Sequence, residues 1–183
     1  MANLVWAMFD ALFIVYAVAP GPLGLTPAEF GLVLSLGALG GILSSLVLPL
    51  LLRRIPPTVL LAIDILGTAM LAVPIAVGAP LAVIAGGIVL AAAGSIAWRI
   101  IAASYRQQEL PEHLLGRAYS ASRVISWGSL PIGAGIATVV AAVAGVTAVF
   151  QVASGIAAVL IVLFAVMLVP PRRRVRLHGA PTV

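Results

Sequence analysis

Residues 147–169 read TAVFQVASGIAAVLIVLFAVMLV and contain no charged side chain. A helix needs about 20 predominantly apolar residues to cross the hydrocarbon core of a bilayer, and this stretch is long enough. Similar stretches recur through the 183 residues, of which 63% are hydrophobic and 8% are charged. Soluble domains carry roughly 25% charged residues. The sequence therefore predicts an all-α, polytopic membrane protein.

Turn-forming residues divide the apolar stretches. Pro20-Gly21-Pro22 ends the first stretch, and Thr26 to Glu29 reads as the N-cap and first turn of the next helix. Gly78-Ala79-Pro80 and Gly145 mark later turns. We expect residues 1–171 to form one domain of six transmembrane helices, with spans at about 2–19, 30–52, 57–77, 81–104, 119–143 and 147–169.

Arginine predicts the orientation of these spans. The ten basic residues are all arginines, and they fall in the second and fourth connections, beside the fourth, or in the C-terminal tail, 172–183. Positive charge marks the cytoplasmic side, so both termini are expected in the cytoplasm and the protein in the cell membrane. The net charge of +5 forms no basic face with interleaved aromatic residues, so no nucleic-acid partner is expected.

Small residues are concentrated in two of the expected spans. The second contains Gly37 and Gly41, a GxxxG pair, and the fifth contains Gly128, Gly133 and Gly135. Small residues let membrane helices approach closely. The second and fifth spans are the middle members of two three-span units, and such internal symmetry occurs in secondary transporters.

The segment from Trp98 to Gly133 contains the most specific pattern. It includes Tyr105-Arg106-Gln107, Pro111, Leu114-Leu115-Gly116-Arg117, Ser120, Arg123, Trp127-Gly128 and Pro131. This order resembles the connection between the tenth and eleventh helices of the major facilitator superfamily. It is most similar to the drug:proton antiporter branch that holds macrolide efflux proteins and the enterobactin exporter. Leu23 to Gly31 is similar to the start of that family's eighth helix.

The resemblance covers nearly the whole chain but only half of the family's fold. It implies the C-terminal six-helix half, beginning inside what would be the seventh helix. The family's cytoplasmic motif, rich in Gly, Asp and Arg, is present here only as Arg53-Arg54, without its acidic residue. The resemblance implies a loop motif formed by Arg106, Gln107, Pro111, Gly116, Arg117 and Arg123.

Asp10 is the leading candidate for chemistry because it lies midway along the first expected span, where an unpaired carboxylate is costly. Asn3, Trp6 and Phe13 recur with it at helical spacing, so the four are predicted to share one face. In the resembled fold this helix lines the central cavity. One interpretation is substrate contact with proton coupling at Asp10, and the other is a structural carboxylate bonded to a neighbouring helix.

Three further groups of charged residues have two interpretations each. Trp98 and Arg99 either close the cytoplasmic side of a cavity, or Arg99 extends to the interface. The charges of the fourth connection form ion pairs that orient it, or they are ordinary interfacial charge. Asp64 is expected to serve packing or a salt bridge.

Two functions from different classes are consistent with these features. The resemblance implies proton-coupled efflux of a small amphipathic molecule by a half-size transporter, either a homodimer or paired with a separate N-terminal six-span half. The alternative is a truncated transporter or membrane scaffold without transport activity. No catalytic constellation, metal-ligand cluster or phosphate loop is present, so we expect neither enzymatic activity nor a metal or cofactor.

Overall fold

The computed structural model describes residues 2–168 and consists of six α-helices, which confirms the all-α prediction. Five of the helices are long and apolar enough to cross a bilayer, so the chain is a helical membrane protein. The expected basic tail, 172–183, lies outside the described residues. The helices are α1 (Ala2–Ala17), α2 (Pro27–Leu51), α3 (Pro57–Ala76), α4 (Leu81–Glu109), α5 (Glu112–Ala144) and α6 (Val146–Leu168).

Two helix boundaries lie where the turn chemistry predicts them. Thr26 caps α2: the Glu29 backbone N–H donates to its hydroxyl at 3.3 Å, and its own N–H donates to the Glu29 carboxylate at 2.8 Å. This reciprocal pair satisfies donors that the first turn of a helix leaves free. Gly145 separates α5 from α6 with a φ of +87°, a conformation that glycine adopts without a Cβ clash. The predicted tight turn at this position is confirmed.

α1 is shorter than the predicted first span. It has 16 residues, which correspond to about 24 Å of helix, and the chain beyond it is extended, with Val18 bridged to Leu25. Pro20 explains this early end, because a proline disfavours the helical conformation in the residue before it. α1 is nevertheless well covered by its neighbours, and Val5, Met8 and Phe13 are almost fully buried.

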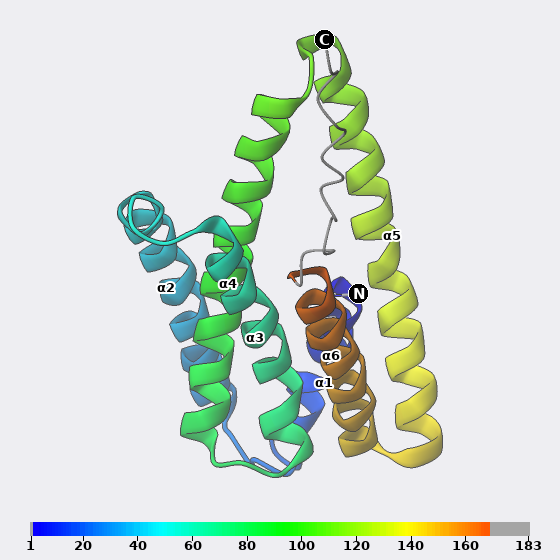
Figure 1. Ribbon diagram of the computed structural model, residues 1–183. Helices are drawn as coiled ribbons and strands as arrows, with labels where there is room; N and C mark the ends of the chain where they lie inside the picture. Colours follow the sequence, from blue (N-terminus) through cyan, green and yellow to red (C-terminus); the bar gives the residue numbers. More distant parts are fainter. Residues whose placement is uncertain (1, 169–183) are drawn as a thin grey trace, which may run out of the picture.

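The prediction of a long connection between residues 104 and 119 is wrong. α4 continues to Glu109 and α5 begins at Glu112, so the turn consists only of Leu110 and Pro111. The physical reason is that the intervening sequence is rich in residues that favour helices, and Pro111 is the only strong breaker. With 29 and 33 residues, α4 and α5 are the longest helices, and their hairpin projects beyond the rest of the bundle (Figure 1).

In sequence order the six helices can be divided into two trios, α1–α2–α3 and α4–α5–α6. In space, the first helix of each trio packs with the other two helices of the opposite trio. α1 packs against α5 and α6, whereas α4 packs against α2 and α3 (Figure 1). α3 and α6 pack against each other and join the two sides. α5 and α6 also pack against each other and α1 also contacts α3, and neither contact has a counterpart of similar extent in the other trio among the described residues. The two trios therefore share the exchange of their first helix but not every contact.

The interior combines an aromatic core with close helix contacts. Phe9 stacks on Phe13 with ring centroids 4.4 Å apart, and Tyr16 meets Phe150 of α6 edge to face at 5.5 Å. These rings fix α1 against α6 and contribute about 0.5–1.5 kcal/mol per pair beyond burial.

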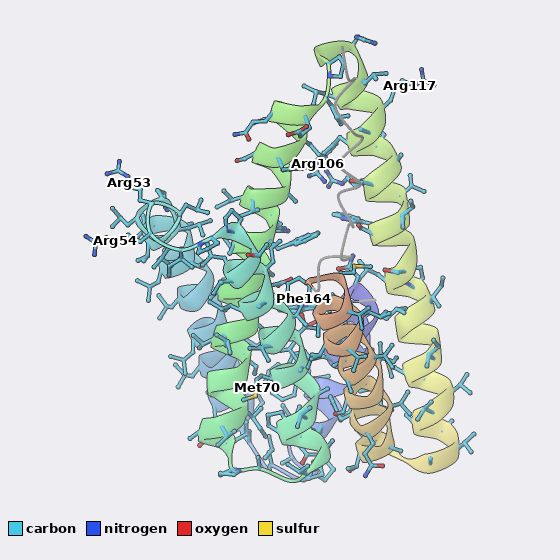
Figure 2. The ribbon with its side chains drawn as sticks, in the orientation of Figure 1. Arg53, Arg54, Met70, Arg106, Arg117 and Phe164 are labelled. Atoms are coloured by element: carbon cyan, nitrogen blue, oxygen red, sulfur yellow. The ribbon has the colours of Figure 1, made fainter. Side chains whose placement is uncertain are left out.

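All arginines of the described chain lie toward one end of the bundle. Arg53 and Arg54 occupy the α2–α3 turn, while Arg106 and Arg117 lie on the α4–α5 hairpin (Figure 2). The three turns at the opposite end contain no arginine. The two ends of the bundle therefore differ in charge, which is the asymmetry that sets orientation in membranes.

Candidate functional site

Asp10 is exposed on α1, although most of this helix is buried or half-buried. The neighbouring Phe9 is only 3% exposed, and Ile14, one turn further on, is 51% exposed. Residues four apart lie on one face of a helix, so Asp10 and Ile14 belong to the strip of α1 that no other helix covers. The structure thus places a carboxylate at mid-helix on an open face.

Asn3, Trp6 and Phe13 are predicted to share one face with Asp10, but helix packing gives them different surroundings. Phe13 is 2% exposed and lies in the aromatic core, where it also meets Phe30 of α2 at 5.6 Å. Trp6 is half-buried against the same core. The prediction of one accessible face is therefore wrong for Phe13. Helical spacing spreads these positions over a wide arc, and Phe13 falls at its buried edge.

Asn3 joins α1 to α5. Its side-chain amide donates a hydrogen bond of 2.7 Å to the backbone carbonyl of Ser126. Close to this bond, Gly133 brings the two helices together, since a Cβ there would lie 2.9 Å from the Leu4 carbonyl oxygen. Asn3 therefore positions α5 beside the open strip of α1 in this structure.

Trp98 and Arg99 are exposed on α4, with half of the Trp98 surface accessible. α4 packs on α2 and α3, while α1 packs on α3, α5 and α6. Within residues 2–168, α4 therefore makes no extensive contact with α1 that would bring Trp98 and Arg99 together with Asp10. Closure of a cavity by these two residues stays a prediction.

Among the described side chains of the hairpin, Arg106 and Arg123 contact aromatic rings. Arg123 stacks on Trp127 at 4.5 Å and on Tyr119 at 5.6 Å, and it donates a hydrogen bond of 2.8 Å to the Tyr119 hydroxyl. Arg106 of α4 contacts the same tyrosine, with its guanidinium carbon 6.0 Å from the ring centroid. The resulting cluster connects the two helices of the hairpin.

Sequence reasoning missed Tyr119 as a member of this site. The signal was present, because positions 119, 123 and 127 repeat at a spacing of four and alternate aromatic, basic and aromatic side chains. Of the other residues in the expected loop motif, Pro111 forms the turn, and Gln107, Gly116 and Arg117 are exposed at its two sides.

The best-formed depressions in residues 2–168 are open on the surface. One lies at the end of α1 and is lined by Ile14, Val15 and Val18 to Gly21. The other lies on α5, over Ser120, Arg123, Val124 and Trp127. Neither encloses a small molecule, and the described residues contain no cluster of three potential metal ligands.

Comparisons with protein-family models, curated proteins and solved structures find no match to this chain.

Proposed function

We propose that the chain is a half-size transporter that exports a small amphipathic molecule in exchange for protons. In this proposal all six helices cross the cell membrane, and both termini are cytoplasmic. The observation that carries the proposal is the exposed carboxylate of Asp10, halfway along a short helix of an apolar bundle, where the other exposed side chains of the helix are apolar. A carboxylate facing lipid is costly, so this position calls for water or a polar partner surface.

The exposed apolar side chains of α5, a helix that packs on α1, support an assembly of two six-helix units. Val124, Ile125 and Val143 of α5 are all more than 70% exposed, and the depressions of the single chain are open. A second unit placed against the side of the bundle that exposes Asp10 would complete a two-sided cavity with Asp10 inside it. A homodimer is the simplest such assembly, because two-fold symmetric pairs are common. A separate six-span N-terminal half is the other candidate partner.

The exchange of α1 and α4 between the two trios also supports transport. Structural repeats allow rigid units to rock around a central site, which is how alternating access operates in many secondary transporters. The resemblance to the drug:proton antiporter branch assigns proton exchange and an amphipathic substrate within this class.

The assembly is tested by native mass spectrometry of the full chain after gentle detergent extraction. We expect a dimer, or a defined complex with a second six-span chain. A monomer under conditions that preserve bound lipid would contradict the half-transporter and favour a fragment or scaffold without transport activity.

Transport is tested with proteoliposomes that contain a fluorescent amphipathic dye and carry a proton gradient. Asp10→Asn is expected to abolish gradient-driven dye movement, because the amide cannot exchange a proton. Glu109→Gln is the matched control, since Glu109 is an exposed carboxylate at the end of α4, and it should retain transport. Normal proton-driven movement in Asp10→Asn would exclude coupling at this residue.

A further inference from the structure

The exposed tryptophan and tyrosine side chains of residues 2–168 all lie in the halves of α4 and α5 that adjoin the hairpin turn. They are Trp98, Tyr105, Tyr119 and Trp127, and each is at least half exposed. Tryptophan and tyrosine are enriched where the hydrocarbon core of a bilayer meets water, because their rings contact lipid while their polar atoms reach the headgroups. This part of the hairpin therefore marks the level of a bilayer interface.

The length of α5 indicates the same level independently. Residues 124–144 contain no charged side chain and correspond to about 31 Å of helix. The hydrocarbon core of a bilayer is about 30 Å thick. With the Gly145 turn at the opposite boundary, Arg123 is the first charged residue of α5 beyond the hydrocarbon core, at the level of the lipid headgroups.

Arg123 is held at this level by two aromatic side chains. Its guanidinium carbon lies 4.5 Å from the centre of the Trp127 ring, and a guanidinium nitrogen donates to the Tyr119 hydroxyl at 2.8 Å. Stacking uses the flat face of a guanidinium group, whereas the N–H groups on its edge are the ones that bind phosphate oxygens. The exposed Arg123 side chain is thus oriented in advance for an anion.

A second positive charge approaches from α4. The guanidinium carbons of Arg106 and Arg123 both lie within 6.0 Å of the centre of the Tyr119 ring. Two like charges repel each other, and an anion beside them offsets that repulsion. The open depression at Arg123 is also lined by Ser120, Val124 and Trp127, none of which is acidic. The cluster therefore favours a ligand with a net negative charge and an apolar part.

We infer that Tyr119, Arg123 and Trp127 form a binding site for the phosphate group of an anionic phospholipid, to which Arg106 adds positive charge. The Arg123 edge binds the phosphate oxygens, and Trp127, one turn deeper in the bilayer, contacts the start of an acyl chain. A zwitterionic lipid fits less well, because its ammonium group would bring a third positive charge to the cluster. Soluble phosphate has no apolar part for Trp127.

The inference depends on insertion into a membrane and not on transport. Val124 is also one of the exposed α5 side chains that support the proposed assembly. In that assembly the lipid would lie at the edge of the contact between the two units, on the side of the hairpin.

Native mass spectrometry of the full chain counts bound lipids directly. The protein is titrated in detergent with dimyristoyl phosphatidylglycerol, which carries one negative charge, and with zwitterionic dimyristoyl phosphatidylcholine. We expect the first phosphatidylglycerol to bind each chain about fivefold more tightly, or better, which is the effect of one basic residue near an anionic lipid.

Arg123→Gln should lower the affinity for phosphatidylglycerol about fivefold, to that for phosphatidylcholine. Arg54→Gln is the matched control: it removes the same charge from the same end of the bundle, but on the α2–α3 turn away from the hairpin (Figure 2), and should have little effect. Tyr119→Phe keeps the ring and the charge but removes the hydrogen bond that orients Arg123, so a smaller loss is expected. Helical circular dichroism checks that the three variants are folded.

Equal affinities for the two lipids would overturn the inference. Equal losses in Arg123→Gln and Arg54→Gln would also overturn it, because binding would then follow overall charge. Complete displacement of phosphatidylglycerol by millimolar inorganic phosphate would identify a soluble phosphate as the ligand instead. The same spectra count chains and lipids separately, so a failure of lipid binding is distinguishable from a failure of the proposed assembly.

Discussion

α4 and α5 are both long and contain several glycines, but only some of these glycines lie at helix contacts. On α4, Gly87 and Gly94 are buried against α3, and a Cβ at either position would collide with backbone atoms of Met70 or Asp64. On α5, Gly128 and Gly135 have no atoms of another helix within 4 Å of a Cβ. Glycine composition alone therefore does not indicate a helix interface.

Within α2, too, some glycines lie at a close helix contact and others do not. The GxxxG pair of the sequence is Gly37 and Gly41, but the close contacts with α4 are made by Gly37 and Gly40. Ser44 extends this line, and its hydroxyl donates a hydrogen bond of 2.7 Å to the carbonyl of Ala93. The α2–α4 contact thus follows positions 37, 40 and 44, a spacing that keeps one side of a helix facing its partner.

The largest expected effect is at the α3–α4 contact. Gly94→Leu should lower the free energy of unfolding by about 3 kcal/mol or more, because its side chain would displace the α3 backbone. Gly135→Leu on α5 is the control and should leave stability nearly unchanged, since its side chain meets open space. Thermal unfolding in mild detergent, followed by circular dichroism, measures the difference. Equal melting temperatures would contradict the contrast between the two helices.

A smaller effect is expected where α5 crosses α1. Gly133→Ala places a methyl group 2.8 Å from the Ala7 Cβ and 2.9 Å from the Leu4 carbonyl oxygen. We expect a loss of about 1–2 kcal/mol, because α5 packs less extensively on its neighbours than α4 does and can shift. Gly128→Ala, one and a half turns away on the same helix, is the control. If both variants unfold at the same temperature, Gly133 does not fix this crossing.

The hydrogen bond between α2 and α4 also distinguishes positions that contact another helix from positions that do not, and a smaller loss of stability is expected there. Ser44→Ala removes the bond to Ala93 and should cost about 0.6 kcal/mol, the average for such bonds between membrane helices. Ser45→Ala is closely matched, because the Ser45 hydroxyl bonds Ile42 within its own helix, and it should have no effect on α4. Chemical unfolding of both variants in the same detergent gives the comparison. A larger loss of stability in Ser45→Ala than in Ser44→Ala would contradict this expectation.

The smallest effect is expected in the α4–α5 hairpin, where the contacts are exposed. Trp127→Leu removes the ring over Arg123 and should cost about 0.5 kcal/mol, as exposed cation–π pairs do. The readout is amide hydrogen exchange across residues 112–127, which should become faster. Tyr105→Leu, at an exposed aromatic position of α4, should leave this exchange unchanged, and equal acceleration in both variants would show that the ring contact is not specific.

The sequence predicted most of the helix bounds because proline, glycine and the Thr26 cap act locally. It overestimated the connection after residue 104, since charged and amide side chains were interpreted as a loop although they also favour helices. It also placed Phe13 with Asp10, because periodicity gives the direction of a side chain but not the identity of its neighbours. The burial of Asp64 depended on α4, which no local pattern in α3 could reveal.

By itself, the sequence determined that the protein is helical and apolar and that its arginines gather at one end, because these properties follow from side-chain chemistry and the order of apolar stretches. The tertiary structure decided which glycines are contacts and which carboxylate is enclosed. Both depend on the distance between helices that are far apart in the chain, and helix packing alone sets that distance. Asp10 and Asp64 each lie midway along an apolar stretch, and only the neighbours of α1 and α3 give them different surroundings.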